Sequence, residues 1–95
     1  DVDGNFLPEV YALNQNYPNP FNPSTTISFD LIEIADTRLI LYDVRGRELE
    51  QIVNRNMAPG RYTVTFNGSA LASGVYFYRL TSGEFSDVKK LMLLK

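Results

Sequence analysis

Carboxylates are the most chemically versatile side chains of this sequence, which contains no cysteine, histidine or tryptophan. Without thiols and imidazoles, the usual nucleophiles, proton-transfer bases and zinc ligands are missing. The carboxylates available for an acid–base pair are Asp30, Glu33, Asp36, Asp43, Glu48, Glu50, Glu84 and Asp87. They fall on predicted strand surfaces and turns, and no pattern gathers them into a cleft. The sequence therefore predicts a protein that is not an enzyme, with no catalytic, cofactor-binding or metal-binding residues and no cofactor.

Two short patterns resemble ligand or modification sites. The segment Asp1-Val2-Asp3-Gly4-Asn5 alternates oxygen ligands as a calcium loop does, but its glycine is fourth rather than sixth and a closing glutamate is missing. We interpret it as linker, and leave open whether it belongs to a calcium site of a preceding domain. Asn67-Gly68-Ser69 matches the glycosylation acceptor pattern. We interpret Asn67-Gly68 instead as a turn that requires positive φ.

The composition limits both the size of the fold and the kinds of partner. A chain of 95 residues with 44% hydrophobic content can form one domain of two packed layers. The formal charge of -2 comes without a basic block, so nucleic acid is not expected as a partner. No apolar stretch approaches the ~20 residues of a membrane helix. The N-terminus does not look like a signal peptide, so any export signal would lie upstream in a longer protein.

The segments that must position any functional surface are predicted to be strands. Residues 1–12 are predicted to be a linker or N-terminal arm, and residues 13–95 the domain. Three prolines between Tyr17 and Ser24 prevent a helix or a central strand from running through that stretch. Alternation of apolar and polar residues, or β-branched and aromatic runs between turn residues, predicts strands near 24–31, 37–44, 48–54, 61–66, 75–80 and 85–94. The fold class is therefore all-β, an immunoglobulin-like antiparallel β-sandwich of about seven strands.

Tyr76 has the spacing of a tyrosine corner. It stands two residues after Gly74 and two before a predicted inward position on the strand. In immunoglobulin-like sandwiches such a hydroxyl bonds to backbone a few residues upstream. The alternative is an ordinary amphipathic strand residue.

Four ordered blocks, covering about residues 13–95, resemble a known family. They are Tyr17-Pro18-Asn19-Pro20-Phe21-Asn22-Pro23-Ser24-Thr25-Thr26-Ile27, Leu41-Tyr42-Asp43-Val44-Arg45-Gly46-Arg47-Glu48, Ser73-Gly74-Val75-Tyr76-Phe77-Tyr78-Arg79-Leu80 and Lys89-Lys90-Leu91-Met92-Leu93-Leu94-Lys95. In this order and spacing they are similar to the type A C-terminal sorting domain of type IX (Por) secretion, which is related to immunoglobulin-like hook-capping domains.

The resemblance implies a module that ends its protein and directs an upstream passenger domain across the outer membrane of a Gram-negative bacterium. It implies two partners, the outer-membrane type IX translocon and a sortase-like peptidase that often removes the module. The passenger is then secreted or held at the cell surface, after passing through the periplasm. By position, the resemblance implies recognition roles for Pro18, Asn19, Pro20, Gly74, Tyr76, Lys89, Lys90 and Lys95.

Two other readings of the sequence remain open. The chain could be an accessory carbohydrate- or protein-binding β-sandwich of an extracellular enzyme that presents its six tyrosines for stacking. It could also be a structural spacer. For the sorting reading, we hypothesise that residues 89–95 pair with a strand of the translocon by β-augmentation.

Overall fold

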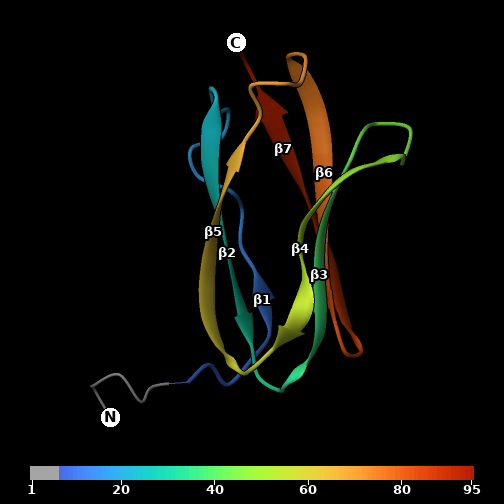
Figure 1. Ribbon diagram of the computed structural model, residues 1–95. Helices are drawn as coiled ribbons and strands as arrows, with labels where there is room; N and C mark the ends of the chain where they lie inside the picture. Colours follow the sequence, from blue (N-terminus) through green and yellow to red (C-terminus); the bar gives the residue numbers. More distant parts are fainter. Residues whose placement is uncertain (1–6) are drawn as a thin grey trace.

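The computed structural model describes residues 7–95, which form seven strands and no helix (Figure 1). The strands are β1 (Ala12–Leu13), β2 (Ser24–Leu31), β3 (Ala35–Tyr42), β4 (Glu48–Met57), β5 (Gly60–Asn67), β6 (Gly74–Ser82) and β7 (Phe85–Leu93). The calcium-like pattern at residues 1–5 lies outside the described residues.

The strands form two antiparallel sheets that pack face to face. One sheet has the order β1-β2-β5 and the other has the order β4-β3-β6-β7. Every named strand pair is antiparallel, and the two sheets lie on opposite sides of the molecule in Figure 1. This three-plus-four arrangement is an immunoglobulin-like sandwich, so the predicted fold class is confirmed.

Apolar alternation places the core between the two sheets. In β2, Ile27, Phe29 and Leu31 are fully buried, while the residues between them are only half-buried. In β3, residues 39–41 are all buried because β3 lies between β4 and β6, as predicted for an interior strand. The segment predicted as a strand at 48–54 is indeed β4, which continues to Met57.

The strand predicted at 37–44 ends two residues early, at Tyr42. The side chain of Asp43 explains the difference, because its carboxylate accepts hydrogen bonds from the backbone amides of Arg45 (2.8 Å) and Arg47 (3.0 Å). These bonds turn the chain at Asp43, so Val44 belongs to the turn rather than to β3.

The prediction that Asn67-Gly68 requires positive φ is wrong, because neither residue has positive φ. Gly68 instead lies in a tight space: a Cβ atom there would lie 3.2 Å from Phe21 Cε2 and 3.3 Å from Leu93 Cδ2, so these side chains would have to shift. Asn67 shapes the turn through its side-chain oxygen, which accepts the amide of Ser69 at 2.8 Å.

Tyr78 connects the two sheets through the middle of the sandwich. Its ring is fully buried, and its hydroxyl donates a hydrogen bond to the carbonyl oxygen of Asn14 at 2.7 Å. Burial disfavours the charged phenolate form and raises the pKa of Tyr78 to about 12. The negative charge of Asp87 makes a smaller contribution in the same direction.

The raised pKa of Tyr78 predicts a loss of stability in alkali. An unfolded tyrosine ionises near pH ~10, so above that pH the unfolded chain releases a proton that the folded chain retains. The stabilisation is fully present below pH ~10 and is lost as pH rises through about 12. We expect the melting temperature to fall more steeply over this window in the natural protein than in Tyr78→Phe. Parallel slopes for the two proteins would contradict the assignment.

Candidate functional site

The segment between β1 and β2 crosses from one sheet to the other. We call residues 15–23 the Pro-rich arm. Its Tyr17-Pro18, Asn19-Pro20 and Asn22-Pro23 peptide bonds are cis. Tyr17 forms an isolated antiparallel bridge with Thr26 of β2, and Phe21 forms an isolated parallel bridge with Leu93 of β7. The arm therefore joins the edge of β2 to the last strand of the opposite sheet.

Hydrogen bonds from the Pro-rich arm cover the outer edge of β7. The amide of Phe21 donates to the carbonyl oxygen of Met92 at 3.0 Å, and the amide of Leu94 donates to the carbonyl oxygen of Phe21 at 3.1 Å. Asn19 Oδ1 accepts the amide of Met92 at 3.0 Å. Gln15 Nε2 donates to the carbonyl oxygen of Lys90 at 2.6 Å. From Lys90 to its end at Leu93, β7 is bonded on both sides.

The arm is held in place by one aromatic anchor. Phe21 is 2% exposed and packs edge-on against Phe66, with ring centroids 6.2 Å apart. Gly68 and Leu93 close the pocket around its ring. Removal of this much apolar surface from water is a large stabilising contribution for one side chain, about 1.5–3 kcal/mol.

A buried polar network fixes the start of the arm. Asn16, 2% exposed, donates through Nδ2 to Thr25 Oγ1 at 3.0 Å and to the carbonyl oxygen of Pro18 at 3.1 Å. Thr25 Oγ1 donates to the same carbonyl oxygen at 2.9 Å, and Gln15 Nε2 bonds Asn16 Oδ1 at 2.6 Å. All described buried side-chain polar atoms have a partner. The network is therefore satisfied, and it fixes the backbone position of Pro18.

The three recognition residues predicted in the arm lie next to the C-terminal half of β7. Pro18, Asn19 and Pro20 are all exposed. Pro18 contributes its carbonyl oxygen to the buried network, and Asn19 bonds Met92. Whether a partner reads these side chains stays a prediction.

Gly74 and Tyr76 lie at the start of β6, in register with Leu93 and Leu91 of β7. Tyr76 donates a hydrogen bond to the carbonyl oxygen of Ala72 at 2.6 Å, so the predicted tyrosine corner is confirmed. Gly74 has φ +155°, a conformation that side chains disfavour. Both residues thus shape the turn that supports the end of β7.

A second corner of the same kind was missed from the sequence. Tyr62 donates a hydrogen bond to the carbonyl oxygen of Ala58 at 2.6 Å, and Gly60 between them has φ +158°. The signal was present, because Ala58-Pro59-Gly60-Arg61-Tyr62 and Ala72-Ser73-Gly74-Val75-Tyr76 share the spacing Ala-x-Gly-x-Tyr.

The three predicted lysines lie along β7 and just beyond it. Lys89 pairs with Tyr78 and Lys90 with Phe77, so adjacent lysines point to opposite faces of the sheet. Lys95 donates through its amide to Ser73 Oγ at 2.9 Å and through Nζ to the carbonyl oxygen of Ser69 at 2.7 Å. The backbone of Lys90 therefore lies against the arm, but its side chain lies on the outer face of the sheet with Phe77, while Lys89 shares the face of the buried Tyr78.

The residues that hold the arm in place were not among the predicted recognition residues. Gln15, Asn16, Phe21 and Thr25 hold the arm against the sandwich. A signal existed for Phe21, because it is the only large aliphatic or aromatic residue between Tyr17 and Ile27. Nothing in the local pattern distinguishes Asn16, whose burial depends on contacts with Pro18 and Thr25.

The arm bears on the hypothesis that residues 89–95 pair with a partner strand. Free β-augmentation needs an unpaired edge. From Lys90 to Leu94 the arm already occupies this edge, so a partner strand could pair there only by displacing the arm. The hypothesis stays a prediction.

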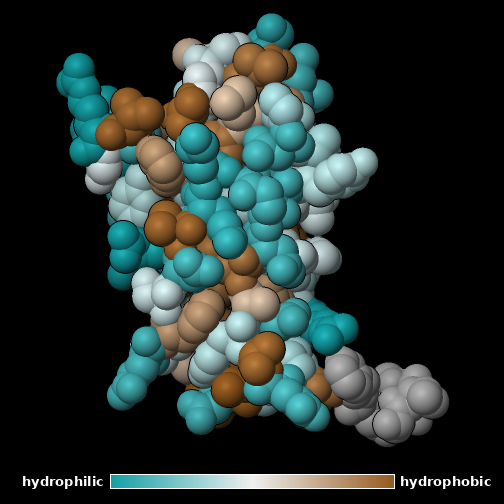
Figure 2. All heavy atoms as spheres, turned by 180° about the vertical axis from the view of Figure 1, so that it is seen from behind, coloured by the Kyte–Doolittle hydropathy of each residue, from teal (hydrophilic) through white to brown (hydrophobic). Residues whose placement is uncertain are grey.

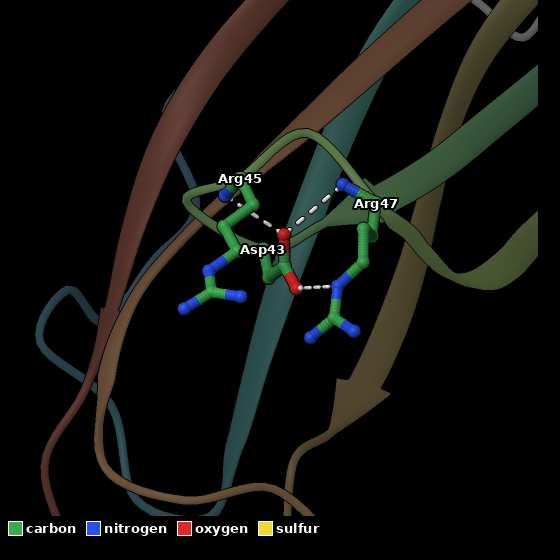
Figure 3. A network of polar contacts seen from close by, with 3 residues as sticks. All are labelled: Asp43, Arg45 and Arg47. Carbon is green, nitrogen blue, oxygen red and sulfur yellow. Dashed lines mark hydrogen bonds and ion pairs between the residues drawn. The ribbon is translucent and has the colours of Figure 1, made fainter.

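The turn between β3 and β4 is a second ordered polar site (Figure 3). Asp43 Oδ2 accepts a bond from Arg47 Nε at 2.8 Å, and its other oxygen accepts the two backbone amides described above. The amide of Arg47 is the main cause that holds the pKa of Asp43 below its usual value, with further lowering by the Arg47 side chain. The guanidinium of Arg45 lies beside this network without joining it.

Within residues 7–95, no helix is long and apolar enough to span a membrane. No group of three or more acidic residues in this range is placed to hold a metal ion. Four of the six tyrosines are engaged within the fold: Tyr76 and Tyr78 are buried, Tyr11 is stacked on Phe85 at 4.7 Å, and Tyr62 is stacked on Phe29 at 5.6 Å.

Fold and site together define a small immunoglobulin-like sandwich whose last strand is braced by an arm distant in the sequence. Residues 15–94 match the family model of the secretion system C-terminal sorting domain. Because this match covers most of the chain, the protein belongs to that family. No curated protein and no solved structure gives a match.

Removal of the Tyr76 hydroxyl should destabilise the domain. Tyr76→Phe keeps the ring but leaves the carbonyl of Ala72 without its donor, at a cost of about 1 kcal/mol in the free energy of unfolding. Tyr42→Phe is the matched control, because its hydroxyl makes no hydrogen bond among the described residues. Denaturant unfolding of both variants measures the difference, and equal midpoints would show that the corner bond contributes nothing.

The two asparagines of the Pro-rich arm should behave differently. Asn19→Ala removes the acceptor of the Met92 amide and should lower the free energy of unfolding by about 0.5–1.5 kcal/mol. Asn22→Ala should be neutral within ~0.5 kcal/mol, because Asn22 is exposed and bonds to no described residue. Amide hydrogen exchange at Met92 should accelerate only in Asn19→Ala. Unchanged exchange there would contradict the arm's role.

Proposed function

We propose that the surface formed by the Pro-rich arm and the C-terminal half of β7 is what the type IX machinery recognises. Membership of the family makes the chain a C-terminal signal for type IX secretion. The signal acts on an upstream passenger, which is exported. One observation supports the location of the recognition surface: the first and last blocks of the resemblance lie side by side, joined by three hydrogen bonds.

Exposed side chains on the arm support the same surface. Tyr17 is 81% exposed, the highest value among the large apolar or aromatic side chains of the described residues. Its backbone pairs with Thr26, but its ring packs on little of the protein. An exposed aromatic ring on a fixed backbone is a good anchor for a partner, because binding can bury a large apolar surface. Pro18 and Pro20 add rigid apolar surface beside it.

The partners in the proposal are the outer-membrane type IX translocon, which binds this surface, and a sortase-like peptidase, which processes the module. The passenger passes through the periplasm of a Gram-negative bacterium and is secreted or held at the cell surface. The functional unit is residues 13–95, preceded by a linker or arm at residues 1–12. The module itself carries no catalytic role, and Lys90 and Lys95 lie at the rim of the recognition surface.

A reporter experiment tests this function. Residues 13–95 are fused behind a reporter that carries a periplasmic export signal, in hosts with and without type IX secretion. We expect the reporter in the medium or on the cell surface only where the system is present. Periplasmic retention in both hosts would overturn the proposal.

Tyr17→Ser should reduce export several-fold without lowering the melting temperature, because the ring contributes contacts to a partner rather than to the fold. Ile34→Ser is the matched control: Ile34 is 66% exposed and lies in the turn between β2 and β3, away from the arm. Equal export of both variants would argue against the arm as the recognised surface.

Replacement of Leu93 by proline should abolish export. Leu93 is fully buried and pairs with Gly74, so proline there removes core packing and a bond of the sheet. The exposed change Thr63→Ala on β5 should leave export intact. If Leu93→Pro were exported as well as Thr63→Ala, recognition could not depend on the folded last strand.

A further inference from the structure

The outer face of the four-stranded sheet has a shallow hollow of about 460 Å³ beside the β3–β4 turn. Its floor and walls are apolar side chains of three strands and one turn: Tyr42 of β3, Val44 of the turn, Phe77 of β6 and Val88 of β7. Arg79 of β6 lies among them, in register with Val88. Figure 2 shows hydrophobic and hydrophilic side chains side by side on the projecting corner that carries this turn.

Exposed apolar side chains gather around this hollow. Val44 is 66% exposed and Val88 45% exposed, and both line it. Leu49, at 40%, follows the same turn at the start of β4. None of these three side chains belongs to the buried core, so folding does not require the cluster. Grouped exposed apolar residues with a polar rim are typical of interaction surfaces.

The hollow's lining holds one guanidinium, that of Arg79, and one carboxylate, that of Asp43. Glu48 lies in register with Tyr42 at its edge, and its carboxylate accepts a hydrogen bond from Gln51 at 3.0 Å. The only carboxylate in its lining, Asp43, is already bonded to Arg47 and to two backbone amides. Arg79 has no side-chain hydrogen bond or ion pair with any described residue. Lys90 pairs with Phe77 and places a further cation on the same face. A ligand for this hollow should therefore bring a negative charge together with apolar surface.

We propose that this hollow is a docking site for a peptide segment of a partner protein in which an acidic side chain lies next to a bulky apolar one. The apolar side chain fills the space between Tyr42, Phe77 and Val88, and the carboxylate pairs with Arg79 in the planar two-bond geometry that a guanidinium offers. The size of the hollow suits one side chain and its neighbour. Val88 and Lys90 belong to β7, so the site is continuous with the proposed recognition surface.

That the partner belongs to the secretion machinery rests on the proposed function. That the hollow binds an acidic and apolar peptide does not. A binding measurement and an export measurement therefore separate the two claims.

The test variant is Arg79→Glu, since Arg79 is exposed and its replacement should leave the fold intact. The control is Arg55→Glu, the same charge change on an exposed residue of β4 outside the hollow. Melting temperatures within a few degrees of the natural domain confirm folding of both.

The binding probe is the amidated peptide Ser-Leu-Asp-Phe-Ser, followed by NMR on the isotopically labelled domain. We expect the peptide to change the NMR chemical shifts only of Tyr42, Phe77, Arg79 and Val88. Arg79→Glu should bind the peptide at least tenfold more weakly than the natural domain, and Arg55→Glu should bind it with unchanged affinity. Exchange of the peptide's aspartate for lysine should also weaken binding at least tenfold, and added salt should weaken the natural complex. No shifts at the hollow, equal binding of the lysine peptide, or binding only to phosphatidylglycerol vesicles would overturn the proposal.

The same variants in the reporter fusion complete the test. We expect Arg79→Glu to lower export several-fold relative to Arg55→Glu. If the natural domain is exported and Arg79→Glu is exported equally well, the hollow is not a docking site of the secretion machinery. If the natural domain itself is not exported, the proposed function fails, and the peptide measurement still decides whether the hollow binds acidic apolar segments.

Discussion

The outer edge of β7 is the place on which the rest of this structure depends. A last strand with a bare edge would leave backbone donors and acceptors unpaired and would invite pairing with other chains. Here the Pro-rich arm supplies the missing partners through Phe21, Asn19 and Gln15, so β7 is bonded on both sides over its C-terminal half. Proline limits the arm to a few backbone donors, and this suits a segment that caps an edge instead of extending the sheet.

Two kinds of interaction set the position of the arm, apolar packing and hydrogen bonding. The ring of Phe21 is held by apolar packing against Phe66 and the bare backbone of Gly68, which is non-directional and strong. Asn16 and Thr25 hold the other end by directional hydrogen bonds to the carbonyl of Pro18. Packing fixes how deep the arm sits, and hydrogen bonds fix its register. Together they place Asn19 where its side chain meets the amide of Met92.

The elements of this fold could be predicted where the cause is local. Alternation in β2 and β5, the apolar centre of β3 and the spacing of Tyr76 after Gly74 all carry their explanation within a few residues. The errors arose where the cause is distant or specific to one side chain. Asp43 ends β3 early through its own carboxylate, and Gly68 is small because Phe21 and Leu93 occupy the space beside it. The coverage of β7 by the arm has no periodic signature, because its partners lie about seventy residues apart and only the folded sandwich brings them together.

This distance has a consequence for a sorting signal. The arm precedes β2, and β7 is the last strand, so their shared surface exists only after both sheets have formed and packed. Each half alone is a short segment: a proline-rich stretch without a partner, or an apolar strand with two bare edges. Loop closure over such a separation is entropically costly, and the core residues between the sheets must offset that cost. The arm and β7 meet only through the packed sheets, so Asn19, Lys90 and Lys95 come together at these positions in the folded sandwich, not through any segment that is local in the sequence.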